Sequence, residues 1–334
     1  MSHRILVLGK RGGVLQWYEH LISAGQAMPE VEVEGFALNH NNFRERTAKK
    51  ISRILDKSKP DKIAASNLQK KIDGFQPTIV LIVDLFYLSE SILEVLRGSK
   101  AFTRSKIYHW VGDFFDERLV NSKDIIDQYY FSDTGLVSSA TAMGLENSEY
   151  LPLAFNPALF NNIEPTELRS DALLFVGAWS ENRENLLKGI KFPMRIIGKG
   201  WGSMTGTPHI ITGENISITE VAKLYKKHKF VLNNINSDNI NCGLNMRCFE
   251  APASGALLIT DDVPDLKLCY EPGNEVVFYR NAQQLTEQYT ALCVGNQERQ
   301  TIQKAGTERA FGHHTYSHRL ETIIMNTDEK NANE

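Results

Sequence analysis

Short apolar runs alternate with stretches of helical periodicity along most of the chain. The runs are rich in Val, Ile and Leu, a pattern typical of strands that are buried on both faces. Strands that alternate with helices build parallel sheets covered by helices, so the pattern predicts an α/β protein. The predicted strands are Ile5–Leu8, Val31–Leu38, Thr78–Val83, Lys106–Trp110, Ala172–Val176, Met194–Ile197, Lys229–Leu232 and Ala256–Thr260.

The alternation stops near Leu151–Pro157 and restarts after the polar stretch Asn161–Arg169, where prolines disfavour regular structure. A chain of 334 residues is long enough for two domains that each bury a core. We therefore predict domains at 1–155 and 156–326. Residues 327–334 are polar and charged without an apolar period, which indicates a disordered tail.

Composition narrows the functional class. A net charge of −3 with 42% hydrophobic residues is typical neither of nucleic-acid-binding proteins nor of disordered chains. The four cysteines show no Cys-x-x-Cys pair and no histidine cluster at metal spacing, so we expect no metal site, no cofactor and no disulfides. The chain enters its first strand almost directly and has no apolar run of transmembrane length. These features predict a cytoplasmic protein.

The segment 243–264 carries the most chemistry. A helix predicted at 246–254 would offer its first N–H groups, near Asn245 and Met246, to a phosphate. Arg247 adds a planar and permanently charged fork. Glu250 follows three residues later on the same helical face, where a carboxylate can accept hydrogen bonds from ribose hydroxyls. The pattern indicates a site for a nucleoside diphosphate.

Three further cationic or glycine-containing segments follow predicted strands of the chain. Gly12 and Gly13 follow the first strand, where Rossmann folds bind phosphate, but they equally suit a tight turn. Gly177 ends a strand, and Arg183 lies in the first turn of the next helix, where its side chain reaches a diphosphate or lies in solvent. Lys199, between two glycines, is a second candidate phosphate ligand.

Two features of the N-terminal half have a functional and a structural interpretation each. Asp113 follows a strand and either deprotonates an acceptor hydroxyl or caps the next helix. Residues 44–71 are strongly basic with apolar residues at helical spacing. They either contact an anionic membrane, which would place the protein peripherally at its inner face, or form a solvated helix face.

The segments 151–157, 174–178, 197–201, 243–264, 270–275, 305–309 and 314–319 together resemble CgeB-like glycosyltransferases, which are related to the family 4 retaining enzymes. The resemblance implies a GT-B fold, with two Rossmann-like domains whose parallel sheets face each other across a cleft. The N-terminal domain would take the acceptor and the C-terminal domain the sugar nucleotide. By the same resemblance, Ile211 and Thr212 would meet the nucleobase, and Gly12 and Gly13 would face the donor.

The chain departs from the family 4 pattern at one position. Cys242 stands where that pattern has the first of two glutamates, which leaves the donor sugar and the anomeric outcome open. We predict a metal-independent and retaining transferase with Asp113 and Arg247 as catalytic residues, in the synthesis of cell-surface polysaccharides or glycoconjugates. The donor is a UDP-, GDP- or dTDP-sugar, and the acceptor is a glycan, a lipid-linked molecule or a protein. A nucleotide-sugar epimerase and a non-catalytic sugar-nucleotide sensor are the alternatives.

Overall fold

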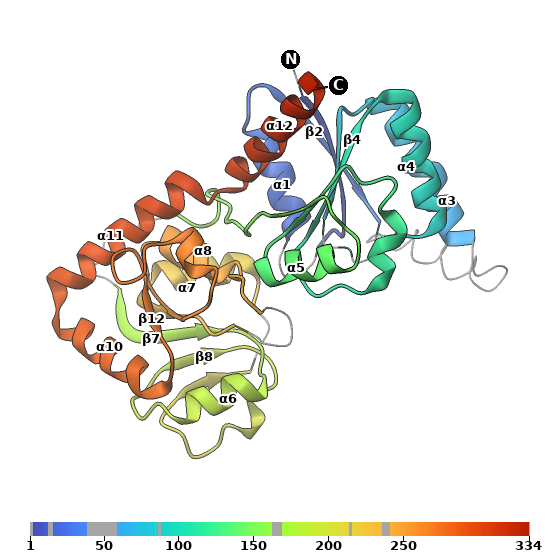
Figure 1. The fold of residues 1–334 in the computed structure, drawn as a ribbon. Coiled ribbons are helices and arrows are strands. Elements are labelled where there is room, and N and C mark those ends of the chain that lie inside the picture. The colour runs from blue at the N-terminus through green and yellow to red at the C-terminus, as the bar shows by residue number, and fades with distance from the viewer. Residues whose placement is uncertain are drawn as a thin grey trace. The chain divides into compact units, whose positions relative to one another are not determined.

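The computed structural model describes residues 3–12, 16–38, 59–83, 85, 88–161, 169–213, 216–235 and 241–333. The chain forms two compact units, which are residues 1–151 together with 316–334, and residues 152–315. Each unit contains one parallel sheet of six strands with helices on its faces (Figure 1). Each predicted strand is present within a few residues of its predicted bounds.

The sheet of the first unit has the strand order β2-β1-β3-β4-β5-β6. Its strands are β1 His3–Gly9, β2 Val31–Ala37, β3 Ile79–Val83, β4 Lys106–Val111, β5 Gln128–Phe131 and β6 Ser148–Tyr150. The described helices of this unit are α1 Trp17–Gln26, α3 Lys59–Phe75, α4 Glu90–Thr103, η1 Glu117–Ser122, α5 Thr134–Ala142 and α12 Tyr316–Asn333.

Alternate residues of these strands face opposite sides of the sheet, as the pleat requires. On one side, Leu6 and Leu8 of β1 lie in a buried cluster with apolar residues of α3 and α4. On the other side, the Trp110 ring of β4 contacts Trp17 of α1 at 4.7 Å and Tyr316 of α12 at 6.3 Å between ring centroids. Both faces are therefore covered by helices.

Helix α12 differs from the expectation for the end of the chain. Residues 316–326 were expected in the C-terminal domain and 327–334 in a disordered tail, but the helix runs to Asn333 and belongs to the first unit. Thr327 is buried and shares a 2.8 Å hydrogen bond with the Tyr108 hydroxyl of β4. Asn326 donates to the Tyr130 hydroxyl of β5 at 2.8 Å. The polar residues of α12 pair with tyrosine hydroxyls of the sheet, and an apolar period does not reveal such partners.

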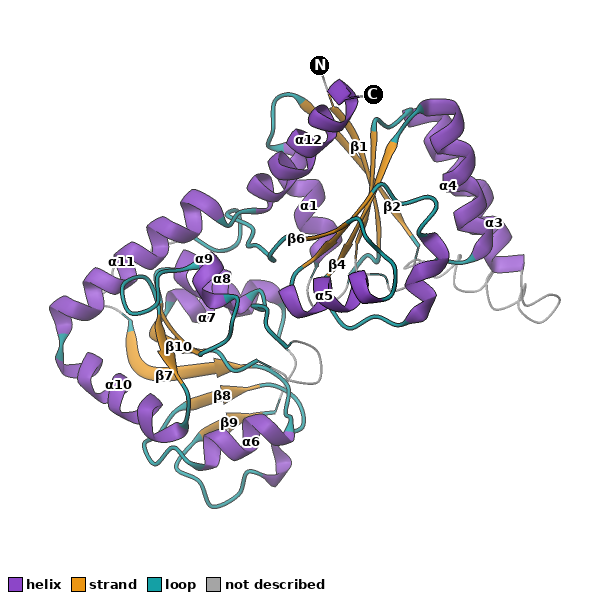
Figure 2. Ribbon diagram, in the orientation of Figure 1, coloured by secondary structure: helices purple, strands orange, loops and turns teal. Residues whose placement is uncertain are grey.

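The sheet of the second unit has the order β12-β11-β10-β7-β8-β9. Figure 2 labels β10, β7, β8 and β9 of this sheet. The strands are β7 Ser170–Val176, β8 Arg195–Ile197, β9 Ile210–Thr212, β10 His228–Leu232, β11 Leu257–Asp261 and β12 Val277–Tyr279. In the described part of this unit, the helices are α6 Glu181–Lys188, η3 Trp201–Ser203, α7 Ile218–Lys226, α8 Arg247–Ala253, α9 Leu266–Cys269, α10 Ala282–Val294 and α11 Asn296–His313.

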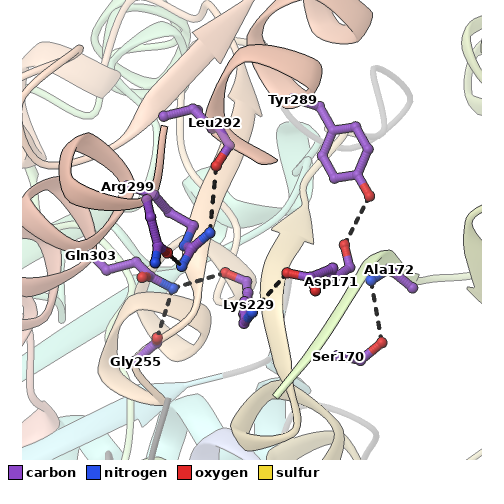
Figure 3. Close-up of polar contacts among 10 residues, drawn as sticks. Ser170, Asp171, Ala172, Lys229, Gly255, Tyr289, Leu292, Arg299 and Gln303 are labelled. Carbon is purple, nitrogen blue, oxygen red and sulfur yellow. Dashed lines mark hydrogen bonds and ion pairs between the residues drawn. The ribbon is translucent and has the colours of Figure 1, made fainter. Parts of the chain in front are cut away.

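Polar side chains at the amino-terminal end of the second sheet tie helices α10 and α11 to the strands (Figure 3). Gln303 of α11 donates to the carbonyl groups of Lys229 at 3.0 Å and Gly255 at 3.4 Å. The Lys229 ammonium pairs with the Asp171 carboxylate at 2.8 Å. Arg299, which is 3% exposed, lies over the Phe230 ring and donates to carbonyl and amide oxygens of α10 and α11. These contacts fix the helices on the sheet.

Candidate functional site

The carboxyl-terminal end of the second sheet contains a point where the strand order reverses. The chain runs from β7 outward through β8 to β9, and then returns to place β10 on the other side of β7. Neighbouring strands whose connections leave in opposite directions open a crevice at their carboxyl ends, where α/β proteins bind ligands. In this unit that position lies between β7 and β10.

Arg247 bridges these two strands from the first position of α8. Its Nη2 donates to the carbonyl oxygen of Val176, the last residue of β7, and its Nη1 donates to Oδ1 of Asn233, directly after β10. A side chain at Gly177 would place its Cβ 3.1 Å from Nη2, so the glycine gives the guanidinium its room. The arginine singled out in the sequence therefore lies where the strand order reverses.

The amide of Asn233 is oriented by partners on both sides. Its Nδ2 donates to Thr260 Oγ1 at 3.0 Å and to Asp261 Oδ1 at 3.4 Å, both at the end of β11. Its Oδ1 accepts from Arg247 and, at 2.8 Å, from Nδ2 of Asn245. The side chain thus presents only its oxygen to the arginine, and Asp261 helps to hold it in that orientation.

Sequence reasoning did not single out Asn233, Asn234 or Asp261 as individual site residues. Asp261 accepts hydrogen bonds from the Ile235 backbone at 2.8 Å and from Asn234 Nδ2 at 3.3 Å, while burial raises the pKa of its carboxyl group. The available signal was the run of polar residues directly after each of the buried strands β10 and β11. Polar residues at that end of parallel strands lie at the ligand-binding edge.

Glu250 lies one helical turn beyond Arg247 on α8 and is 5% exposed. Its Oε1 atom is buried without a hydrogen-bond partner. Burial raises the pKa of the carboxyl group to about 8, against the opposing effect of the Arg247 charge. A buried carboxyl oxygen without a donor is costly, so a ligand hydroxyl that reached it would be stabilised.

Arg183 lies at the same edge, but its guanidinium is engaged with backbone. Nε and Nη2 donate to the Asn234 carbonyl at 3.3 and 3.0 Å, and Nη1 donates to the Ala178 carbonyl at 2.9 Å. Its guanidinium carbon is 5.6 Å from the centroid of the Phe175 ring, and that of Arg247 is 5.2 Å from the same centroid. Arg183 thus ties the loops after β7 and β10 together, and two positive charges lie close to this ring.

The remaining donor-side candidates continue along the same sheet edge. Lys199 is exposed in the loop after β8, and the Gly198 N–H donates to the Thr212 carbonyl at the end of β9 at 3.0 Å. A Cβ at Gly198 would lie 2.0 Å from the Gly177 carbonyl oxygen, so a side chain cannot fit at this position. Ile211 and Thr212 are partly buried in β9. Met246 is buried, so only its backbone is placed to meet a ligand.

The candidate site residues of the first unit lie in the loops after β1 and β4. Gly12 has a φ of 73°, and its N–H donates to Glu19 Oε1 at 2.7 Å, whereas Gly13 lies outside the described residues. Asp113 follows β4 and accepts from the Phe114 N–H at 2.9 Å, and burial raises the pKa of its carboxyl group. The helix cap expected of Asp113 is supplied by Asp116, which accepts from the Arg118 N–H at the start of η1.

The basic segment 44–71 lies outside the described residues up to residue 58 and continues into α3. Of the described helices, none combines the length and apolar composition that a bilayer crossing requires. Within the described part of the chain, no three His, Cys, Asp or Glu side chains gather as a metal site would need.

Sequence comparison finds a match to the family model of glycosyl transferase-like proteins over residues 175–325. The spore protein CgeB of Bacillus subtilis (strain 168) is 25% identical over 222 residues, which are 60% of this chain and 68% of that protein. The resemblance to CgeB-like glycosyltransferases is thereby confirmed.

Similar solved structures extend over almost the whole chain. Alr3699/HepE of Anabaena, in complex with UDP, has a TM-score of 0.67 and 11% identity and covers 98% of this chain and 100% of its own. A glycosyltransferase of Rickettsia africae ESF-5 has a TM-score of 0.68 and 11% identity, with 98% of each chain covered. The sucrose-phosphate synthase (tll1590) of Thermosynechococcus elongatus has a TM-score of 0.63 and 12% identity, with 99% and 100% covered. The predicted fold class, GT-B with two Rossmann-like domains, is confirmed.

Proposed function

We propose that this chain transfers a sugar from a nucleoside diphosphate sugar to an acceptor hydroxyl. The observation that carries the proposal is the position of Arg247, which bridges β7 and β10 where the strand order reverses. The match to glycosyl transferase-like proteins covers this region, and similar structures are complexes with UDP and UDP-glucose. Among the predicted donors, a UDP-sugar therefore has the most support.

The partners of Arg247 suit the binding of a diphosphate. Its Nη2 and Nη1 hydrogen bonds go to a backbone carbonyl and an amide oxygen, both uncharged, so they orient the guanidinium without neutralising it. A fixed guanidinium stabilises the charge that develops on a leaving diphosphate as the glycosidic bond breaks. Lys199 supplies a second and exposed cation at the same edge. We propose that these cations serve in place of a divalent metal ion.

Glu250 would recognise the ribose of the donor. Its buried Oε1 atom lacks a hydrogen-bond partner, and a ribose presents two neighbouring hydroxyl donors. It lies one turn from Arg247 on α8, so the two side chains are neighbours on one face of the helix. The pair therefore supports a nucleotide ligand over inorganic phosphate.

On the acceptor side, we assign Asp113 as the group that takes the proton of the attacking hydroxyl. Burial raises the pKa of its carboxyl group, which moves the group toward the range where a general base works well near neutral pH. Retention of the anomeric configuration is part of the proposal and follows from the resemblance to the family 4 retaining enzymes.

A panel of nucleotide sugars tests the proposed function. The protein is incubated with UDP-, GDP- and dTDP-sugars, and free nucleoside diphosphate and sugar are measured by mass spectrometry. Slow release of nucleoside diphosphate that continues in EDTA is the expected result. Inversion of the sugar without release of nucleoside diphosphate would identify an epimerase. Binding without any reaction would identify a non-catalytic sensor, the alternative suggested by Cys242 in place of the first glutamate. Release that EDTA abolishes and manganese restores would refute metal independence.

A further inference from the structure

One tryptophan of the chain differs from the other three in its exposure. Trp17, Trp110 and Trp201 are 3% exposed or less, whereas Trp179 is 41% exposed. Trp179 lies two residues beyond Gly177, in the loop between β7 and α6. A large exposed aromatic side chain at the ligand-binding edge of a sheet is a candidate contact surface.

The indole of Trp179 is held in place despite its exposure. Its Nε1 donates to Glu184 Oε2 of α6, and Ser203 Oγ donates to the same oxygen at 2.7 Å. The Lys188 ammonium pairs with the other carboxylate oxygen, Oε1, at 2.5 Å. Glu184 is itself buried, so the carboxylate that fixes the indole is fixed in turn.

The backbone fixes Trp179 from the side of β8. The Trp179 N–H donates to the Lys199 carbonyl at 2.8 Å. A Cβ at Gly200 would lie 2.9 Å from the Trp179 Cβ, so the close approach of the two loops requires glycine there, as does its φ of 89°. A side chain that is rigid before binding loses little conformational entropy when a ligand stacks on it.

The position of Trp179 relates it to the diphosphate site. Arg247 is bonded to the Val176 carbonyl at the end of β7, three residues before Trp179, whose own backbone is bonded to the loop after β8. A ligand with its diphosphate at Arg247 that extends along the sheet edge toward β8 and β9 would pass the loop that carries Trp179. Building on the proposed function, we propose that Trp179 is the stacking platform for the nucleobase of the donor.

Stacking on an indole gives affinity for any base, because every nucleobase has a π face. Trp179 would thus strengthen nucleotide binding without choosing among uracil, guanine and thymine. The choice would fall to groups that meet the edge of the base, such as the backbone of β9, where Ile211 and Thr212 lie.

Intrinsic fluorescence of the full chain tests this proposal, because the other three tryptophans are buried. UDP is expected to quench the emission of the wild type, and inorganic pyrophosphate is not. Trp179→Phe should abolish the quenching yet keep UDP affinity within a few-fold, because a phenyl ring also stacks. Trp179→Ala should weaken UDP binding about tenfold or more while leaving pyrophosphate affinity unchanged.

Phe311→Ala is the matched control, because it removes an exposed aromatic side chain of α11 in the same unit. It should change neither quenching nor affinity. Equal UDP affinity of wild type and Trp179→Ala by calorimetry would refute stacking of the nucleobase on Trp179 but would not contradict the proposed function. Quenching by free glucose in the absence of nucleotide would assign the indole to a sugar ring and also refute that stacking. Failure of the wild type to bind any nucleoside diphosphate would overturn both proposals together.

Discussion

The two ends of the second sheet use polar side chains in different ways. At the amino end, Lys229 is paired with Asp171, and Gln303 donates to two backbone carbonyls (Figure 3). At the carboxyl end, Arg247 is oriented by uncharged oxygens, and Glu250 keeps a buried oxygen without a donor. The first arrangement joins helices to strands, whereas the second leaves charge and hydrogen-bonding capacity for a ligand. Mutations at the two ends should therefore affect different measurements.

The largest effect on stability is expected from Arg299→Ala at the amino end. The substitution removes hydrogen bonds to Leu292 and Asn296 and the packing over Phe230. The free energy of unfolding should therefore fall by about 3 kcal/mol. Nucleoside diphosphate affinity of the folded protein should stay unchanged. Denaturant titration and calorimetry measure the two quantities. Arg299→Met should recover part of the stability, since it keeps apolar packing. A large loss of nucleoside diphosphate affinity would place Arg299 in the ligand site and contradict the division of roles between the two ends of the sheet.

Arg247→Ala should show the converse pattern. Loss of a fixed guanidinium contact should weaken nucleoside diphosphate binding by on the order of 2 kcal/mol, or about 30-fold, and by calorimetry this should exceed any change in UMP binding. Stability should fall by less than in Arg299→Ala, because Arg247 is less buried. Arg247→Lys should rescue only part of the affinity. Arg195→Ala, which removes a cation at the start of β8, is the control and should bind normally. Unchanged affinity in Arg247→Ala would refute the site.

Glu250 should make the stability of the protein fall as pH rises. Below about pH 4.5 the carboxyl group is protonated in both states and contributes nothing. Between there and about pH 8 the folded state retains a proton that the unfolded state has released, so the free energy of unfolding decreases. Since one pH unit is worth about 1.4 kcal/mol per proton, the loss from pH 6 to 8 is on the order of 2 kcal/mol. Glu250→Gln should remove this dependence.

Glu184→Gln is the control for that pH profile. Hydrogen bonds from Lys188, Ser203 and Trp179 lower the pKa of the Glu184 carboxyl group to about 2. Its stabilising effect is present above the unfolded pKa of 4.5 and is lost as pH falls toward 2. The substitution should therefore lower stability at neutral pH and remove the loss of stability between about pH 4.5 and 2, but leave the slope between pH 6 and 8 unchanged. A wild-type stability that does not change between pH 6 and 8 would show that Glu250 is ionised in the folded protein.

Glu250→Gln should also distinguish ribose from deoxyribose. If the carboxyl group receives both ribose hydroxyls, the substitution should weaken UDP binding by about 1 to 2 kcal/mol and 2′-deoxy-UDP binding by less. Calorimetry with the two nucleotides measures the difference. An equal loss for both would mean that Glu250 acts on the fold of α8 and not on the ribose.

The smallest effect is expected from Lys229→Met. The Lys229 side chain is mostly buried, but that of its partner Asp171 is 64% exposed, so solvent screens the pair. The loss of stability should be about 0.5 kcal/mol, with no change in nucleotide affinity. Thermal unfolding in low and high salt measures it, and the difference from wild type should shrink as salt rises. A difference in stability that grows with salt would mean that Lys229 stabilises the fold through packing and not through its charge.

The parts of the fold that the sequence predicted are those with continuous apolar runs. Strands β1 and β11 are buried on both faces and are read directly from such runs. Strands β5, β6 and β12 were not among the predicted strands, because they are short and their sequences, QYYF, SEY and VFY, lack an aliphatic run. Their place in the sheets depends on pairing with neighbours distant in the chain.

The sequence likewise predicted only part of the candidate site. Arg247 and Glu250 were found because their spacing on one short helix is local. Asn233 and Asp261 are 28 positions apart, and they meet because β10 pairs with β11 in a register that sets Leu232 opposite Ile259. Such a register is a property of the folded sheet, so composition and spacing do not reveal the amide that orients the arginine.

Helix α12 has a consequence for the synthesis of the protein. The first sheet is translated within the first 151 residues, yet the helix that covers Tyr108 and Tyr130 is made only after residues 152–315. A nascent chain on the ribosome must therefore keep a partly covered aromatic face while the second unit is translated and folds. The N-terminal domain can complete its packing only after the C-terminal one has left the exit tunnel, the reverse of the usual order for consecutive domains.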